Sequence, residues 1–386
     1  MTFHTGVAGL QALRASWDAI LGRKSQPRFF HEWSWYRAYL ENLEPVPEEV
    51  CFGLLTNGNG PVAIVPLQSA SQSYRGLTER FWRLPEHSHM SLADVICADD
   101  VSGEELVARL LAAMRARRMR WDCLQLSRFG DESGLSCTAL TVGRGIYRDT
   151  PTTCDYLVCD RPWEALARGF SANFRSNLNK ARHKIDRAGG AHYEFVNDPG
   201  RIHAVFAEHL QVEASGWKGA AGTRSAISLD PRLVGFYNSL IDDFAPAGRV
   251  FVNLMRFGER VIASQFCLCD ADTIYVLKLG YDESFAHLGP GNSLLEQIVR
   301  WCSMSTRLRK INLVGSPPWF QDWKPEHSNL YRLRIFNRTA LGQLHRIEWA
   351  ARARLRPWVH AMRDSTVAHR LGYGHASNRA GTRRSA

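Results

Sequence analysis

The chain has 386 residues, more than the ~100–200 residues of one domain, so we expect two domains. Its 45% hydrophobic content is typical of a globular protein and argues against wholesale disorder. No run approaches the ~18 apolar residues of a membrane span, and the start MTFHTGVAGL has no charged region leading into an apolar core. We therefore expect a cytoplasmic protein, with peripheral attachment to the inner membrane as the alternative.

The nine cysteines are scattered, and none forms a C-x-x-C pair. Most lie in apolar, strand-like runs, where cysteine behaves as a small hydrophobic residue. The sequence therefore predicts reduced thiols and no metal site.

The first half is predicted to contain a β-hairpin, a helix and a strand. Residues 51–67 form two apolar runs around an Asn-Gly turn, which is typical of a hairpin. Ser102 with Glu105 three positions later predicts a capped helix start, and residues 121–126 form the next strand-like run.

The second half repeats this order. Residues 250–266 form another hairpin pattern, 273–280 a third strand, 294–302 an amphipathic stripe and 310–314 a closing strand. The repetition favours an α/β fold with a mixed sheet in each of two tandem units. Chance similarity between common elements is the alternative.

The net charge of +10 is concentrated near the C-terminus. From His345 onward there are nine arginines against Glu348 and Asp364. Such a tail is either solvated charge or a surface that attracts an anionic ligand, a nucleotide or an anionic membrane. The sequence thus predicts three parts: units 1–165 and 166–345, and a basic helical or disordered tail, 346–386.

A glycine cluster opens the second unit's amphipathic helix. Gly289 and Gly291 flank a proline and precede Asn292 and Ser293, whereas residues 88–95 of the first unit have no glycine. A helix N-terminus presents unpaired N–H groups and a partial positive charge, and glycines allow an anion to approach closely. The cluster is either a pyrophosphate-binding loop or a turn in which Asn292 or Ser293 caps the helix.

The order of hairpin, third strand, glycine loop, helix and strand resembles the acyl-CoA-binding core of the GNAT N-acyltransferases. The pattern F-x-x-x-x-R-S-N-L-x-K-A-R at 170–182, together with 215–218, 280–282, 289–291 and 323–324, is similar to the CelD-type branch of cellulose-synthesis accessory proteins. That branch is similar to the Fem-type transferases, which carry two GNAT units in tandem.

The resemblance implies a catalytic second unit and a first unit without a cofactor loop. The expected co-substrate is acetyl-CoA or another acyl-CoA, held at Gly289, Gly291, Asn292 and Ser293. The expected acceptor is an amino sugar or another precursor of the cell envelope or of exopolysaccharide. One alternative is a Fem-like aminoacyl transferase, although the sustained heptads of a helical arm are missing. The other is an inactive fold that binds an anionic ligand or polysaccharide machinery.

The predicted helix 201–215 supplies candidates for the catalytic base. His209 and Glu213, four residues apart, fall on its apolar stripe, where a polar side chain must be paired or line a cavity. Glu213 is the preferred base, beside Trp217 as an apolar or sugar-stacking wall. A hydrogen-bonded structural pair is the alternative.

A second group of candidates follows the third strand. Asp282 is an alternative base with Tyr281 as its acid, or a turn aspartate. Lys278, in an apolar run, either extends to the surface or reaches an anionic substrate group.

The remaining candidates are substrate-binding residues. Trp319, Trp323 and Lys324 follow the closing strand and suit a sugar or nucleotide-sugar acceptor, although loop aromatics often belong to the core. Lys218, next to Trp217, is a further substrate-binding candidate. Arg175 begins a basic helix that predicts phosphate binding or a solvated face; nucleic acid is disfavoured because no helix-turn-helix or zinc-finger pattern is found.

Overall fold

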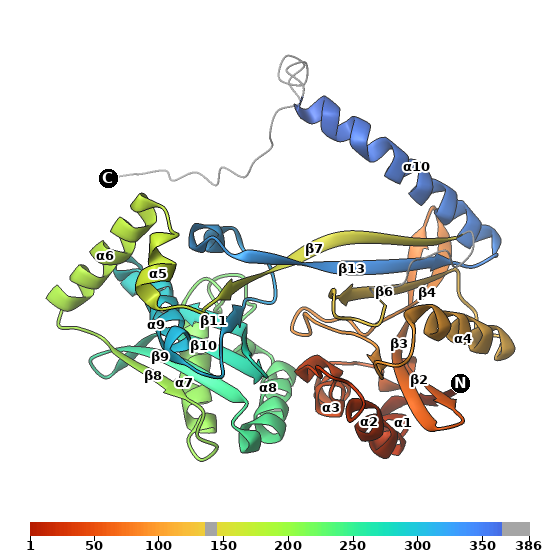
Figure 1. Cartoon of the computed structure of the whole chain (residues 1–386), viewed down its shortest axis with the longest axis horizontal. Coiled ribbons are helices and arrows are strands. Elements are labelled where there is room, and N and C mark those ends of the chain that lie inside the picture. Colours follow the sequence, from red (N-terminus) through yellow and green to blue (C-terminus); the bar gives the residue numbers. More distant parts are fainter. Residues whose placement is uncertain (136–144, 365–386) are drawn as a thin grey trace.

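The computed structural model describes residues 1–135 and 145–364 (Figure 1), so the end of the predicted tail, 365–386, lies outside the described residues. The first unit consists of β1 (Thr2–Thr5), α1 (Gly6–Ala12), α2 (Arg14–Leu21), α3 (Trp33–Asn42), β2 (Val50–Asn57), β3 (Gly60–Tyr74), β4 (Leu77–Arg83), β5 (Ile96–Cys97), α4 (Gly103–Ala116) and β6 (Cys123–Phe129). The second consists of β8 (His192–Val196), α7 (Ile202–Ser215), α8 (Pro231–Phe244), β9 (Val250–Phe257), β10 (Arg260–Asp270), β11 (Thr273–Tyr281), α9 (Pro290–Met304) and β12 (Lys310–Asn312).

Both units have the same strand order. In the first, β1 to β4 pair antiparallel in sequence, and β6 returns parallel to β4 after α4. In the second, β8 to β11 pair antiparallel, and β12 returns parallel to β11 after α9. The predicted α/β fold with a mixed sheet in each of two tandem units is confirmed, and both predicted hairpins are present.

Two long strands join the units into one 13-stranded sheet. β7 (Ile146–Val158) follows β6 in the chain but pairs with β12 of the second unit. β13 (Glu326–Phe336) follows β12 but pairs with β6 of the first unit. β7 and β13 also pair with each other and form the long crossing ribbon in Figure 1. Each unit is therefore completed by a strand from the other half of the chain.

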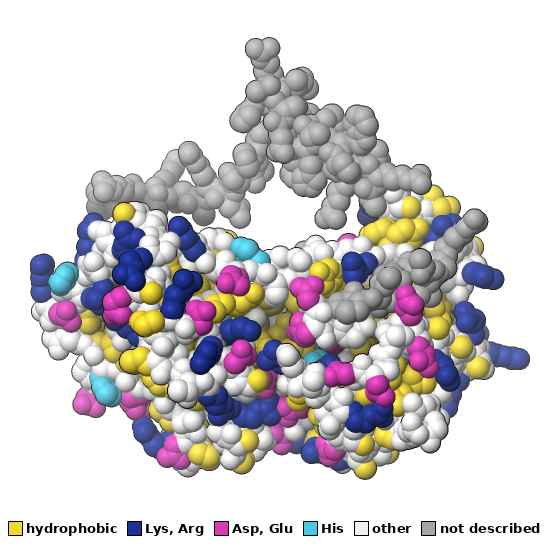
Figure 2. All heavy atoms as spheres, in the orientation of Figure 1, with side chains coloured by type: hydrophobic (Ala, Val, Ile, Leu, Met, Phe, Trp, Pro, Cys, Tyr) yellow, Lys and Arg dark blue, Asp and Glu magenta, His cyan; other side chains and the backbone are white. Residues whose placement is uncertain are grey.

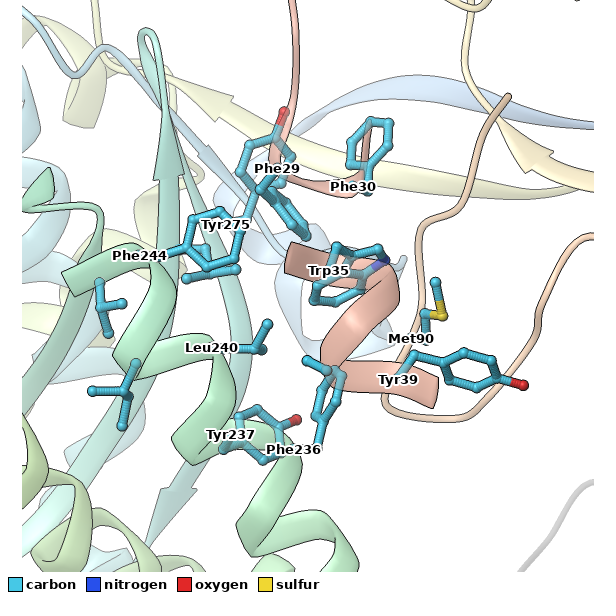
Figure 3. Close-up of a cluster of buried hydrophobic side chains, with 14 of the residues drawn as sticks. Phe29, Phe30, Trp35, Tyr39, Met90, Phe236, Tyr237, Leu240, Phe244 and Tyr275 are labelled. Atoms are coloured by element: carbon cyan, nitrogen blue, oxygen red, sulfur yellow. The ribbon is translucent and has the colours of Figure 1, made fainter. Parts of the chain in front are cut away.

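The units also share a hydrophobic core on the face covered by α1, α2, α3, α7 and α8. At the boundary α3 packs on α8, and aromatic rings interlock there (Figure 3). Trp35 and Phe236 have ring centroids 5.5 Å apart, and Phe29 and Tyr275 are 5.1 Å apart. Because large aromatic side chains are buried across this boundary, the two units are held together by packing as well as by the sheet.

Separate helices cover the opposite face of the sheet. α4 covers the first unit, while α5 (Trp163–Arg168), α6 (Ala172–Arg187) and α9 cover the second. The last helix, α10 (Ala340–Asp364), starts against the first unit, where His345 bonds to Glu79 and stacks on Tyr74, and then projects from the body (Figure 1).

Candidate functional site

A cavity opens where β11 and β12 separate. These parallel strands are paired only at residues 273–275 and 310–312, so the second half of β11 has no partner on that side. The cavity has a volume of about 320 Å³ and is lined chiefly by residues 263–265, 279–281, 289–292 and Trp319. A strand edge with unpaired backbone groups therefore faces the start of α9.

The start of α9 is shaped to receive an anion. Gly289 adopts a left-handed conformation (φ 63°, ψ 46°), and no side chain caps the first turn. A Cβ added to Gly291 would meet only a ring carbon of Tyr281 at 3.8 Å, so this glycine leaves the cavity wall open. The exposed N–H groups and the helix dipole there suit a pyrophosphate. These residues fit the expected acyl-CoA.

The four predicted cofactor residues are placed differently. Gly289, Gly291 and Asn292 line the cavity. The Asn292 Oδ1 atom accepts a hydrogen bond of 3.1 Å from the Trp323 indole, which fixes the amide. Ser293 is buried, and its N–H donates to the Gly289 carbonyl, so Ser293 stabilises the helix start beneath the cavity.

Basic residues of α6 lie beside this helix start. The Ala181 Cβ would be 3.7 Å from a Cβ on Gly289, and the Lys184 amine donates to the His287 carbonyl at 3.3 Å. Figure 2 shows Lys and Arg side chains gathering at the α5–α6 end of the molecule. Arg175 instead stabilises the end of α5, because its guanidinium donates to the carbonyls of Phe170 (2.6 Å) and Arg168.

Glu213 is buried in α7 and both of its carboxylate oxygens are engaged. Oε1 accepts from the Lys218 amine at 3.1 Å, and Oε2 accepts from the Ile227 N–H at 2.8 Å. Lys218 also donates to the Leu279 carbonyl at 2.8 Å. A Cβ on Gly280 would lie 2.7 Å from the Glu213 Cα, so the glycine permits the close approach of α7 and β11. Through Lys218 and this close contact, Glu213 is packed against the edge of β11.

His209 is fully buried one turn earlier. Its Nδ1 lies 2.9 Å from the Ser264 hydroxyl, and its Nε2 has no hydrogen-bond partner. Burial, helped by the charges of Lys218 and Lys278, lowers the pKa of His209 to about 3, so the imidazole is neutral near pH 7. Because Ser264 lines the cavity, this pair connects the cavity with α7.

The two residues at the end of β11 have separate roles. Tyr281 lines the cavity beside Gly291. Asp282 caps the following turn through Ser284 and pairs with Arg260. Burial would raise the pKa of Asp282, but these hydrogen bonds and the arginine charge outweigh it and lower that pKa. A carboxylate stabilised in this way is a poor proton acceptor.

A β-bulge directs Lys278 toward the other unit. The register with β10 shifts between Phe266 and Cys267, which leaves Leu277 as the extra residue of β11. Burial and the charge of Lys218 lower the pKa of Lys278 to about 8. Together with burial, the charge of Lys278 lowers the pKa of His89, whose Nδ1 lies 3.0 Å from the Tyr237 hydroxyl. This second face of β11 therefore carries the positive charge of Lys278 beside a neutral His89, and we call it the cationic face of β11.

The other predicted substrate-binding residues are not gathered at the cavity. Trp323 is fully buried against Phe170 and Phe174, so it acts on the site only through Asn292. Lys324 is exposed and lines a separate hollow of about 200 Å³ beside α5. Trp217 is 55% exposed; its backbone N–H donates to Glu283, and its carbonyl accepts from the Thr223 N–H at 2.7 Å.

Two polar residues of the cavity lining were absent from the predicted site. Ser264 and Gln265 are a polar pair inside the apolar run V-I-A-S-Q-F-C, and that interruption was the available signal. Of the residues predicted after the closing strand, Trp319 does border the cavity: it is 43% exposed and lies in the loop after β12. Its position depends on the fold of that loop, which residue spacing does not reveal.

Within residues 1–135 and 145–364, no group of three or more His, Cys, Asp or Glu side chains could hold a metal ion. In the same part of the chain, no helix is both long enough and apolar enough to cross a membrane.

Comparison with known proteins agrees with this geometry. Residues 172–325 match the family model described as an acetyltransferase (GNAT) domain, and these residues contain the cavity and α9. No curated protein sequence matches the chain.

Several solved structures share the fold. FemX aligns with a TM-score of 0.55 and 10% identity, covering 90% of this chain and all of FemX. L-PGS from Bacillus licheniformis aligns with a TM-score of 0.52 and 13% identity over 86% of this chain and 95% of its own. The C-terminal domain of a putative lysylphosphatidylglycerol synthetase from Agrobacterium fabrum aligns with a TM-score of 0.52 and 12% identity, covering 87% of this chain and 95% of that domain. The family match and this fold identify an acyltransferase of the GNAT fold.

Proposed function

We propose that the protein transfers an acyl group, with acetyl-CoA as the first donor to test, to an amino group of a sugar or another cell-envelope or exopolysaccharide precursor. The observation that carries the proposal is the cavity at the uncapped, glycine-lined start of α9, beside the open edge of β11. The sequence similarity of 170–182 and 215–218 to the CelD-type branch supports an acceptor of this kind.

The two units are proposed to have different roles. We propose that unit 166–345 binds the co-substrate through the N–H groups of Gly291 and Asn292, and that unit 1–165 closes the acceptor side. The basic tail, 346–386, is proposed to contact an anionic ligand or the anionic surface of the inner membrane.

Proton transfer is proposed to involve the cavity residues and the cationic face of β11. Bound acyl-CoA supplies an activated thioester. Lys218 and Lys278 help to lower the pKa of His209 to about 3, and the same positive charges would lower the pKa of an acceptor ammonium. The acceptor amine would then be neutral and nucleophilic without a strong base. We propose that the proton which the amine loses on forming the amide bond passes to water in the open cavity, and that Tyr281, which lines the cavity, gives a proton to the departing thiolate.

The cationic face of β11 is also a candidate binding surface for the acceptor. Lys278 forms no ion pair with a carboxylate in the described part of the chain, and Lys218 and His89 lie near it. We propose that Lys278 binds an anionic group of the acceptor, such as the phosphate of a nucleotide sugar.

Thiol release from acetyl-CoA, measured with a panel of amino sugars and nucleotide-linked amino sugars, tests the proposal. Acceptor-dependent release that is lost in Gly291→Asp supports it. Release that does not depend on any acceptor, or that is unchanged in the variant, contradicts it.

Aminoacyl transfer is the second candidate, favoured by the shared fold with FemX and L-PGS. The same acceptor panel with aminoacyl-tRNA in place of acetyl-CoA distinguishes the two. Product formation only with aminoacyl-tRNA would replace the first proposal.

A further inference from the structure

A second cavity lies between the two units. It is larger than the cavity at the start of α9, which we call the catalytic cavity, and lies away from it. It has a volume of about 540 Å³. Residues 25–28 and Glu32 of the first unit line one side, and the β10–β11 turn (270–272), Arg249, Arg307 and Lys310 of the second unit line the other. It lies at the start of β11, whereas the catalytic cavity lies at the end of that strand. We call it the inter-unit cavity.

The charged side chains of the inter-unit cavity are not fully paired with one another. Arg249 lies 2.7 Å from Glu32 and is also bonded to Asp270, and Lys310 lies 3.3 Å from Asp272. These contacts use the three carboxylates. Arg307 is exposed and has no ion pair with any side chain in the described part of the chain. The cavity therefore carries positive charge in excess.

Arg28 is the most informative member of the cavity. Its side chain is only 13% exposed, and its nearest carboxylate oxygen, on Asp272, is 3.9 Å away, too far for a hydrogen bond. Both Nε and Nη1 are buried without a hydrogen-bond partner. A buried guanidinium with unpaired N–H groups is costly, and a missing ion is one of the few explanations for such a group.

The main chain holds Arg28 in this position. Its N–H donates to the His31 Nδ1 atom at 3.0 Å, and the next N–H, of Phe29, donates to Asp270 at 2.5 Å. Phe29 is fully buried between the units, as Figure 3 shows. The main chain of Arg28 is thus fixed between the aromatic core and the cavity that its side chain lines.

We propose that the inter-unit cavity binds a phosphate-bearing small molecule, with Arg28 and Arg307 as its anion-binding side chains. Guanidinium groups form paired, charge-assisted hydrogen bonds with phosphate oxygens. The ligand would connect the loop before α3 with the β10–β11 turn, and so hold the first unit against the second. The phosphate could be inorganic or part of a nucleotide or sugar phosphate, and the volume favours the organic forms.

Calorimetric titration and thermal unfolding test this proposal, with inorganic phosphate, AMP and glucose 1-phosphate as probes at constant ionic strength. We expect saturable binding and a rise in Tm for the wild-type protein. Arg28→Gln and Arg307→Gln should each weaken binding by about tenfold or more, because each removes charged hydrogen bonds. Arg307 is exposed, so its variant folds even where Arg28→Gln does not.

Two control variants separate this cavity from other anion sites. Arg109→Gln removes an exposed arginine of α4, and Gly291→Asp blocks the cavity at the start of α9; the binding that depends on Arg28 and Arg307 should remain in both variants. Tighter binding of AMP or glucose 1-phosphate than of inorganic phosphate would identify the organic form. The proposal is overturned if no probe binds saturably, if Arg307→Gln binds as the wild type does, or if Gly291→Asp abolishes the effect.

Discussion

The starts of α4 and α9 occupy equivalent places in the two units but differ in chemistry. α4 begins at Ser102, whose hydroxyl accepts the Glu105 N–H at 3.1 Å, and two glutamates occupy its first turn. α9 begins after a left-handed glycine and has neither a side-chain cap nor an acidic residue in its first turn. The first helix start is thus closed to anions by a hydroxyl and by negative charge, while the second is open. Of the two units with the same strand order, only the second has a first helical turn with the features that anion binding needs.

The largest effect should come from separating the units. Residues 166–345 alone would lack β7, and residues 1–165 alone would lack β13, so each piece would expose strand edges and half of the shared core. We expect each piece alone to be insoluble or to lack a cooperative thermal transition, and co-expression to restore both. Cooperative unfolding of 166–345 by itself would show that the exchanged strands are dispensable.

The next largest effect should come from Gly291→Asp. The carboxylate would enter the cavity beside Tyr281 and repel a pyrophosphate at the helix start. We expect CoA affinity to fall by about 100-fold or more, since charged hydrogen bonds contribute ~1.5–3 kcal/mol each. Gly58→Asp is the matched control, because that glycine lies in an exposed turn with open space around it. Equal CoA affinity in both variants would exclude the α9 site.

Glu213→Gln distinguishes a base from a positioning residue. The change breaks a buried ion pair with Lys218, which costs about 3–5 kcal/mol when one partner is lost, so we expect a lower Tm. If Glu213 only positions β11, kcat should change modestly. A fall in kcat of ~10²–10⁴ at unchanged Tm and CoA affinity would instead assign the base to Glu213.

A smaller, pH-dependent effect should come from His209. Its pKa is about 3 in the folded protein against 6.5 for an unperturbed histidine, so the unfolded chain binds the proton more readily. Its contribution to stability is full above pH 6.5 and is lost as the pH falls toward 3, by about 1.4 kcal/mol per unit. His209→Gln should therefore reduce the acid sensitivity of the free energy of unfolding, measured with urea from pH 7 to pH 4. An unchanged pH profile would contradict the buried, neutral state of this histidine.

Local patterns were sufficient to predict much of the fold. The Asn-Gly turn, the Ser102 cap and the glycine cluster each act within a few residues, and the structure has the expected hairpin, α4 and α9 at these places. The exchange of β7 and β13 was not predictable, because alternation in a strand shows which face is buried but not which distant strand is its partner.

The candidate site was only partly predictable for the same reason. Gly289 and Gly291 follow from local backbone chemistry. Trp323 has the sequence context of an exposed loop aromatic, yet the loop folds back and buries it on Phe174. Glu213 lies on the buried stripe as expected, but its partner Lys218 is brought to it by a turn that the helical spacing does not describe.

The most direct test of the difference between the units is the number of CoA molecules bound per chain, measured by calorimetric titration of the intact protein. We expect one CoA per chain, bound at the start of α9 and lost in Gly291→Asp. Two CoA molecules per chain, or one that persists in Gly291→Asp, would show that CoA binds elsewhere and that the start of α9 is not the distinguishing site.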